Sequence, residues 1–140
     1  VQGEANAVSP GKRMLSSMTP TFVVGPNRTF IVGTPGCSRI ISMVLLASNG
    51  FRLNKSDPAD WVNTPRFHHQ FLPDVVQYEQ GAFSAKESEE LSRRGHQLKQ
   101  LNRNYGNMYA IILDHKTGKL TGITDRRGEG KSISTNRRMK

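Results

Sequence analysis

Several features that identify common classes of protein are missing from this 140-residue sequence. Its single cysteine, Cys37, excludes an internal disulfide and a zinc site built from several thiolates. No run of about 18 apolar residues is present, so the sequence predicts no membrane-spanning helix. The chain begins at Val1 without an initiator methionine or the basic and apolar segments of a signal peptide. We therefore expect an internal start, within a longer or processed sequence.

Acidic residues are few, since 11 Asp and Glu stand against 20 Lys and Arg, which gives a formal charge of +9 and an isoelectric point near 10.2. Such a balance raises the possibility of a nucleic-acid partner. Aromatic residues make up only 7% of the chain, and neither an aromatic RNA-binding motif nor a zinc-finger spacing is present. The basic residues are scattered, which favours a solvated surface or an acidic partner chain over nucleic acid.

Length and hydropathy allow one domain, or part of a larger one, with a small core. Hydrophobic residues account for 35% of the chain, and the mean hydropathy is −0.55. We expect residues 1–127 to form a partial domain and residues 128–140 to be a basic, mobile tail.

Apolar patterns and turn residues predict two hairpins with helices between them. Strands are expected at 21–24, 29–33, 75–79, 98–101, 108–113 and 120–124. Helices are expected at 38–48, 56–62 and 84–94. The first is apolar nearly all round and is followed by Asn49-Gly50, a helix-end signal. The second has Ser56 or Asp57 as its N-cap, and the third begins with a capping box. Residues 1–15 are expected to be irregular. The sequence therefore predicts an α+β fold in which helices cover an antiparallel sheet.

Two short segments carry the chemistry that the sequence offers. Ser16-Ser17 stands in front of the first strand, and its hydroxyls are suited to bind a carboxylate, although a Ser-Ser pair is more often an ordinary turn. The turn Thr34-Pro35-Gly36-Cys37 follows the second strand and opens an apolar helix. A glycine there allows close approach of a ligand, and the following N–H groups can face an oxyanion.

Other reactive residues have a plainer interpretation. Cys37 has no histidine near it in the sequence, so we expect a small packed residue rather than a nucleophile. His68-His69 are adjacent, and neighbouring residues rarely share one metal, so packing or hydrogen bonding is favoured over a metal site. The run Asp125-Arg126-Arg127 is expected to form an ion pair at the surface or between subunits.

Three long motifs in order resemble the C-terminal part of gamma-glutamyltransferases. They are Arg13-Met14-Leu15-Ser16-Ser17-Met18-Thr19-Pro20, Gly33-Thr34-Pro35-Gly36-Cys37-Ser38-Arg39 and Thr64-Pro65-Arg66-Phe67-His68-His69-Gln70. The resemblance fades only after Arg127. It implies the αββα sandwich of the N-terminal nucleophile hydrolases, of which this chain would form the C-terminal portion of the small subunit.

The resemblance also implies a function. Family members cleave themselves, and the new N-terminal Thr attacks γ-glutamyl amides such as glutathione and passes the glutamyl group to water or to an amino acid or peptide. It assigns the substrate α-carboxylate to Ser16 and Ser17, with Met18 beside them, and the backbone oxyanion hole to Gly36 and Cys37. No cofactor or metal is implied. The partners would be the large subunit and the N-terminal part of the small subunit, in the periplasm or outside the cell.

This sequence departs from the family at two points. The nucleophilic Thr and the residues that bind the substrate amino group are absent, so we expect the chain alone to be inactive and poorly stable. Cys37 stands where the family has the second Gly of a Pro-Gly-Gly turn. A residue with a Cβ fits this position without strain only if its backbone lies outside the left-handed region. Two alternatives stay open, namely an acylase of the same superfamily that acts on another amide, and a non-catalytic basic binding module.

Overall fold

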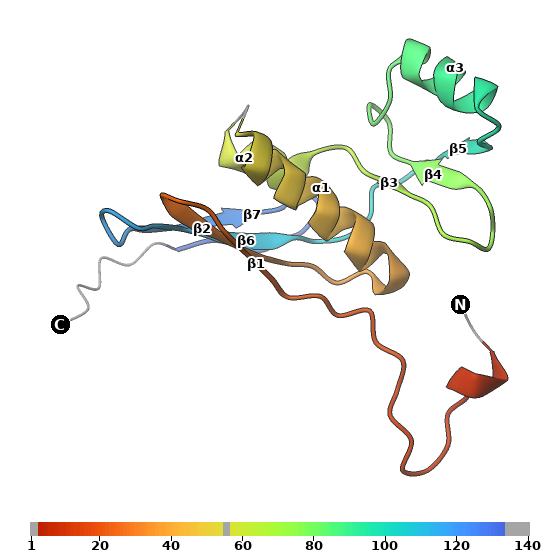
Figure 1. The fold of residues 1–140 in the computed structure, drawn as a ribbon, viewed down its shortest axis with the longest axis horizontal. Coiled ribbons are helices and arrows are strands. Elements are labelled where there is room, and N and C mark those ends of the chain that lie inside the picture. Colours follow the sequence, from red (N-terminus) through yellow and green to blue (C-terminus); the bar gives the residue numbers. More distant parts are fainter. Residues whose placement is uncertain (1–2, 55–56, 134–140) are drawn as a thin grey trace.

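The computed structural model describes residues 3–54 and 57–133, and their arrangement is α+β, as predicted (Figure 1). The strands are β1 (Thr21–Val24), β2 (Arg28–Gly33), β3 (Phe67–His68), β4 (Val76–Tyr78), β5 (Leu98–Gln100), β6 (Tyr109–Asp114) and β7 (Leu120–Thr124). The helices are α1 (Ile40–Leu53), α2 (Pro58–Asn63) and α3 (Ala85–Arg93), with short 3-10 turns η1 (Glu4–Asn6) and η2 (Cys37–Arg39).

The larger sheet has the order β1-β2-β6-β7 and is antiparallel throughout. Both predicted hairpins are present, and β2 and β6 join them over six residue pairs, with Phe30 opposite Ile112. Strand alternation sends Phe30 and Ile112 to the face that α1 and α2 cover (Figure 1). The core therefore lies between these two helices and one face of this sheet.

Three aromatic side chains form the centre of that core. Phe30 and Phe51 stack with ring centroids 5.4 Å apart, and Trp61 meets Phe30 edge-on at 5.8 Å. Their exposed fractions are 0%, 7% and 2%. Burial of each such ring stabilises the fold by roughly 1.5–3 kcal/mol, so the packing of α2 against α1 depends strongly on Trp61.

Helix α1 differs from its prediction in two ways. It does not end at Asn49-Gly50 but continues to Leu53, and Asn54 terminates it in the left-handed conformation (φ 48°, ψ 37°). Gly50 is instead a packing position, because an ideal Cβ there would lie 2.8 Å from the Trp61 side chain. A helix that is apolar nearly all round is expected to be buried, and this expectation is also wrong, since Ile41 and Leu45 are 59% and 57% exposed.

The smaller sheet has the order β3-β4-β5 and is mixed rather than wholly antiparallel. Strands β4 and β5 are parallel because α3 connects them and carries the chain back to the same starting end. Strand β3 is only two residues long, and its pattern predicted no strand. The capping box of α3 is confirmed, with Ser84 and Glu87 each bonded to the other's backbone N–H.

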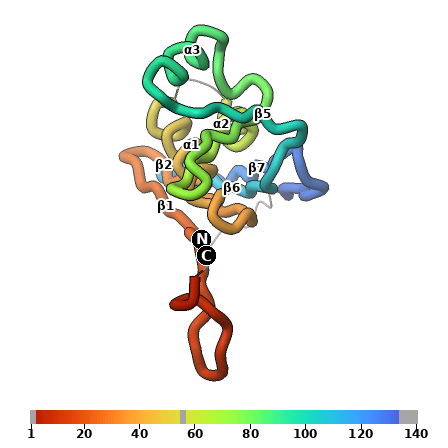
Figure 2. Tube along the Cα trace, turned by 90° about the vertical axis from the view of Figure 1, so that its right-hand side faces the viewer, coloured from red at the N-terminus to blue at the C-terminus, as the bar shows by residue number. Residues whose placement is uncertain are grey.

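The two ends of the chain carry little regular structure. Residues 3–20 form a long loop, with only η1 in it, that extends away from the sheet on the side opposite α3 (Figures 1 and 2). Residues 125–133 follow β7 without a further helix or strand, and residues 134–140 of the predicted tail lie outside the described residues. Of the predicted caps of α2, Asp57 accepts a hydrogen bond from the Ala59 N–H, and Ser56 lies outside the described residues. Across the described ranges, no helix has the length and hydropathy that crossing a membrane requires.

Candidate functional site

The two predicted site segments leave the same end of the first hairpin. Thr21, the first residue of β1, pairs with Val32 near the end of β2. Ser16-Ser17 therefore precedes β1 at the end of the hairpin where Gly36-Cys37 follows β2. Because β6 starts and β7 ends at this same sheet end, the segments 105–108 and 125–128 also lie there. The register thus brings four separate segments to the same end of the sheet, where these strands begin or finish.

The serine pair lies in a turn that leaves its hydroxyls available. Ser16 Oγ accepts a hydrogen bond from the Met18 N–H at 3.1 Å, and Thr19 Oγ1 donates to Ser17 O at 2.8 Å. Ser16 and Met18 are exposed, and Ser17 is half-buried. An oxygen that accepts this bond keeps its own O–H free to donate. The turn therefore fixes the backbone and presents hydroxyl donors to a ligand.

The Pro-Gly turn places two backbone N–H groups at an open surface. Gly36 has φ 146° and ψ 15°, and Cys37 has φ 51°. Both residues are exposed, and within residues 3–54 and 57–133 neither N–H has a hydrogen-bond acceptor. Successive N–H groups in such a turn form a concave site for an anion. This geometry suits the stabilisation of a developing oxyanion.

Cys37 has a backbone φ of 51°, in the left-handed region where a side chain causes strain. A non-glycine residue there costs roughly 1–2 kcal/mol relative to an ordinary backbone conformation. The expectation of a packed thiol is wrong, because Cys37 is exposed. The turn therefore has the glycine-like shape that a Pro-Gly-Gly sequence favours, although a side chain is present.

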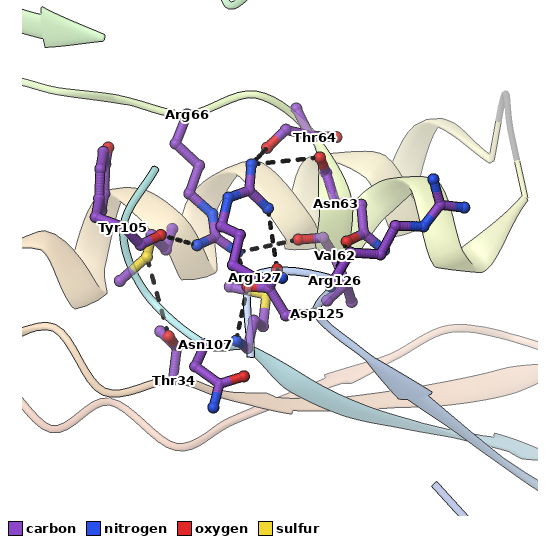
Figure 3. Close-up of polar contacts among 12 residues, drawn as sticks. Thr34, Val62, Asn63, Thr64, Arg66, Tyr105, Asn107, Asp125, Arg126 and Arg127 are labelled. Atoms are coloured by element: carbon purple, nitrogen blue, oxygen red, sulfur yellow. Dashed lines mark hydrogen bonds and ion pairs between the residues drawn. The ribbon is translucent and has the colours of Figure 1, made fainter. Parts of the chain in front are cut away.

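A buried ionic network lies at this end of the sheet, and Figure 3 shows three of its members, Arg66, Asp125 and Arg127. Arg66 and Asp125 form an ion pair at 2% and 1% exposure. Arg127 bonds to Asp125 at 3.0 Å and to Glu79, itself 1% exposed, at 2.5 Å. The prediction of a surface or subunit ion pair for Asp125 and Arg127 is therefore wrong. Two cations and two carboxylates compensate one another inside the fold.

The network fixes the loop that leads into β6. Glu79 Oε1 accepts from the Tyr105 N–H at 3.0 Å, the Arg66 guanidinium donates to Tyr105 O, and Asp125 Oδ2 accepts from the Met108 N–H at 2.9 Å. Each end of segment 105–108 is thus bonded to a buried charged side chain. Hydrogen bonds of this kind to ionised groups are stronger than neutral ones.

The network also shifts the pKa values of Asp125 and Arg127. Burial alone raises the pKa of Asp125, but hydrogen bonds from the Met108 and Arg127 N–H groups and the Arg66 guanidinium leave its pKa below the ordinary value. Burial likewise lowers the pKa of Arg127, while its bonds to Glu79 and Asp125 raise the pKa overall. Asp125 and Arg127 are therefore both ionised at neutral pH.

The histidine pair has the hydrogen-bonding role that was predicted. His68 Nδ1 lies 2.8 Å from Ser42 Oγ, and its Nε2 lies 3.1 Å from Gln70 Oε1. His69 Nε2 instead lies 2.7 Å from Asp74 Oδ1. Each imidazole thus has its own partners. In the described part of the chain, no group of three or more His, Cys, Asp or Glu side chains is arranged to hold a metal ion.

A family model described as gamma-glutamyltranspeptidase matches residues 1–135. The chain belongs to this family. The glutathione hydrolase proenzyme of Escherichia coli (strain K12) is 43% identical over 131 residues, which are 91% of this chain and 22% of that relative. The proenzyme of Pseudomonas aeruginosa is 38% identical over 133 residues, 93% of this chain and 24% of its own length. The chain therefore spans less than a quarter of these curated relatives.

The same family includes solved structures of similar fold. The crystal structure of an acivicin-inhibited gamma-glutamyltranspeptidase superposes with a TM-score of 0.80 at 37% identity. The superposition covers 93% of this chain and 70% of that one. The α+β arrangement described above is therefore that of a gamma-glutamyltranspeptidase, an N-terminal nucleophile hydrolase. Both glutathione hydrolase relatives are named as proenzymes, that is, as precursors.

Sequence reasoning missed part of this site. Arg66 and Glu79 were given no role, although Arg66 lies inside one of the three quoted motifs. A charged residue between Pro65 and Phe67 was the available signal, but its partners are 13 and 59 residues away. No spacing rule links such positions.

Proposed function

We propose that this chain is the C-terminal portion of the small subunit of an enzyme that cleaves γ-glutamyl amides, glutathione among them, and transfers the glutamyl group to water or to an amino acid or peptide. The observation that carries the proposal is the turn at Gly36-Cys37, whose two N–H groups have no acceptor among the described residues. It lies at the same sheet end as the hydroxyls of Ser16 and Ser17. The relatives named glutathione hydrolase support the choice of substrate.

Each site residue then has a role in the reaction. Ser16 and Ser17, with Met18 beside them, bind the α-carboxylate of the γ-glutamyl group, and the N–H groups of Gly36 and Cys37 donate to the oxyanion. The attacking hydroxyl belongs to an N-terminal Thr outside this chain, whose own amino group removes the proton. The carbonyl carbon gains the bond to Thr oxygen, the amide C–N bond breaks, and the amine leaves with a proton. Water or an acceptor amine then takes the acyl group.

A sheet face that is largely exposed supports the proposed partners. The face opposite α1 and α2 carries large apolar residues that are at least 41% exposed, namely Phe22, Val24, Tyr109, Ile111 and Leu120. In an αββα sandwich a second sheet covers such a face. We assign this cover to the remaining parts of the same precursor, which fits the 70% coverage of the solved chain. Without these parts the chain is inactive, and export to the periplasm or outside the cell belongs to the same proposal.

Hydrolysis of a γ-glutamyl anilide by the processed precursor tests this function. Ser16→Ala and Ser17→Ala each remove a hydroxyl that binds a carboxylate, worth about 1.5–3 kcal/mol, so kcat/KM falls about 10- to 100-fold, mainly through KM. Ser9→Ala in the same exposed loop is the matched control and leaves kcat/KM unchanged.

Three outcomes would contradict the proposal. Turnover by the 140-residue chain alone would place the nucleophile within it. Efficient cleavage of simple acyl anilides, with none of γ-glutamyl anilide, would indicate an acylase. Nucleic-acid binding that weakens steeply with salt, in a protein without either activity, would indicate a basic binding module.

A further inference from the structure

The side chain of Met43 lies between two glycines from distant parts of the chain. It projects from α1 and is 1% exposed. An ideal Cβ on Gly36 would come within 2.6 Å of Met43 Cε, and an ideal Cβ on Gly106 would overlap Met43 Sδ. The thioether therefore occupies the space that both glycines leave open, and it touches the Pro-Gly turn and the loop before β6 at once.

A second contact joins Met43 to the other side of the turn. Thr34 Oγ1 lies 3.9 Å from Met43 Sδ, and it donates a hydrogen bond to Pro35 O at 2.9 Å. Figure 3 draws the first of these contacts as the dashed line from Thr34. Met43 thus reaches the turn both before and after Pro35. A side chain with two contacts on one turn restricts its backbone more than a single contact would.

The loop on the far side of Met43 is firmly held. An ideal Cβ on Gly106 would also lie 2.6 Å from Arg66 Nη1, so this glycine is seated between a guanidinium and the thioether. The neighbouring Tyr105 is bonded through its N–H to Glu79 and through its carbonyl to Arg66. A continuous line of contacts therefore runs from the buried ionic network through Gly106 and Met43 to Gly36.

We propose that Met43 is a positioning residue that holds the Gly36-Cys37 turn with both N–H groups facing the oxyanion, an inference that rests on the proposed function. Gly36 at φ 146° and Cys37 at φ 51° occupy conformations that a free chain rarely adopts, and such conformations persist only where surrounding atoms enforce them. The contacts of Met43 with Gly36 and Thr34 restrict the turn to this conformation. An unbranched thioether fits the narrow gap between two backbones, whereas the branched end of leucine does not.

Met43→Leu in the processed precursor tests this role, with Met108→Leu as the matched control. Met108 is equally buried at 1% but is not among the atoms nearest to Gly36. An oxyanion contact acts in the transition state, so Met43→Leu lowers kcat for γ-glutamyl anilide about 10-fold or more with KM within about twofold of wild type. Met108→Leu retains the wild-type kcat. Gly106→Ala, which pushes against the thioether, lowers kcat in the same way.

A second readout does not depend on activity. The exposed thiol of Cys37 lies in the turn, and peptide mass spectrometry follows its alkylation by iodoacetamide at that one site. We expect Met43→Leu to change this rate at least about threefold, and Met108→Leu to leave it unchanged. Equal alkylation rates and equal kcat in the two variants would overturn the role of Met43. A changed rate in a precursor whose wild type does not hydrolyse γ-glutamyl anilide would support Met43 and refute the proposed function.

Discussion

Replacement of Asp125 by asparagine should destabilise the protein more than any exposed charge substitution. Its carboxylate makes four contacts, since Oδ1 accepts from the Arg127 N–H and Nη1 at 3.0 Å each, and Oδ2 accepts from the Met108 N–H at 2.9 Å and from Arg66. Four acceptor sites are the full capacity of a carboxylate. In Asp125→Asn one oxygen becomes an NH₂ group, which places donors against donors in a site that is 1% exposed.

The magnitude follows from what remains after the change. Arg66, 2% exposed, loses its carboxylate partner, and Arg127 keeps Glu79 as its one remaining carboxylate partner among the described residues. Loss of one partner of a buried ion pair costs about 3–5 kcal/mol. That cost is a large part of the roughly 5–15 kcal/mol that stabilises a typical domain. With the urea m-values of about 1–3 kcal/mol/M that small proteins have, this loss lowers the unfolding midpoint by at least about 1 M, and a larger m-value of the assembled protein makes the shift smaller in proportion.

Urea unfolding of the assembled protein, followed by circular dichroism, measures this loss. Asp60→Asn is the matched control, because Asp60 is exposed and its carboxylate makes no hydrogen bond within the described ranges, so its cost stays within about 0.5 kcal/mol. Hydrogen exchange of a peptide spanning 105–113 should quicken in Asp125→Asn alone. A midpoint shift no larger than that of the control would refute the view that the network holds this end of the sheet.

The pH dependence of the difference supplies an independent check of the sign. Despite burial, hydrogen bonds and the charge of Arg66 hold the pKa of Asp125 below its ordinary value in the folded protein, so the stability it contributes is present above the unfolded pKa and is lost as the pH falls through the folded pKa. The difference in unfolding free energy between wild type and Asp125→Asn should therefore stay constant from neutral pH to about pH 4 and shrink below it. A difference that disappears near pH 6 would point to a histidine instead.

Three further outcomes are expected. Burial, and after it the charge of Glu79, raises the pKa of Tyr105 to about 12. Absorbance at 295 nm should therefore show a late ionisation step that is absent in Tyr105→Phe. Because the unfolded chain loses this proton at a lower pH than the folded protein, the free energy of unfolding should fall as the pH rises from about 10 toward 12. Cys37→Gly relieves left-handed strain, so it should retain full kcat, whereas Cys37→Val should lose both kcat and stability. Gly50→Ala improves helix propensity but meets Trp61 at 2.8 Å, so its thermal midpoint should fall at a cost of about 1–3 kcal/mol.

Elements with local signals were predictable from the sequence. The hairpin at 21–33 and the capping box at Ser84 depend on residues within a few positions of one another, and both are present. The serine pair and the Pro-Gly turn were found for the same reason, because each is a short segment beside a strand. Their placement at one sheet end then follows from antiparallel pairing alone.

Features that depend on distant partners were not predictable in this way. Asn49-Gly50 has the composition of a helix end, but Gly50 serves the approach of Trp61, which lies on the next helix. The parallel pairing of β4 with β5 depends on how α3 crosses between them, since alternation within a strand carries no direction. The exposure of Ile41 and Leu45 on α1 was not predictable either, because an apolar pattern within a helix does not specify which of its sides the rest of the chain covers.

Charge and burial point to different partners, and burial is the stronger guide here. Arg66 and Arg127 are balanced by Glu79 and Asp125, so the network is formally neutral and the +9 charge of the chain lies on other residues. Water solvates scattered charged side chains on a protein surface, so they need no partner. The apolar sheet face, on which Phe22 is 67% exposed, is different, because soluble monomers rarely expose such a contiguous apolar surface to water. The surface that most needs a partner is therefore this apolar face, and a protein chain, rather than a nucleic acid, has the chemistry to cover it.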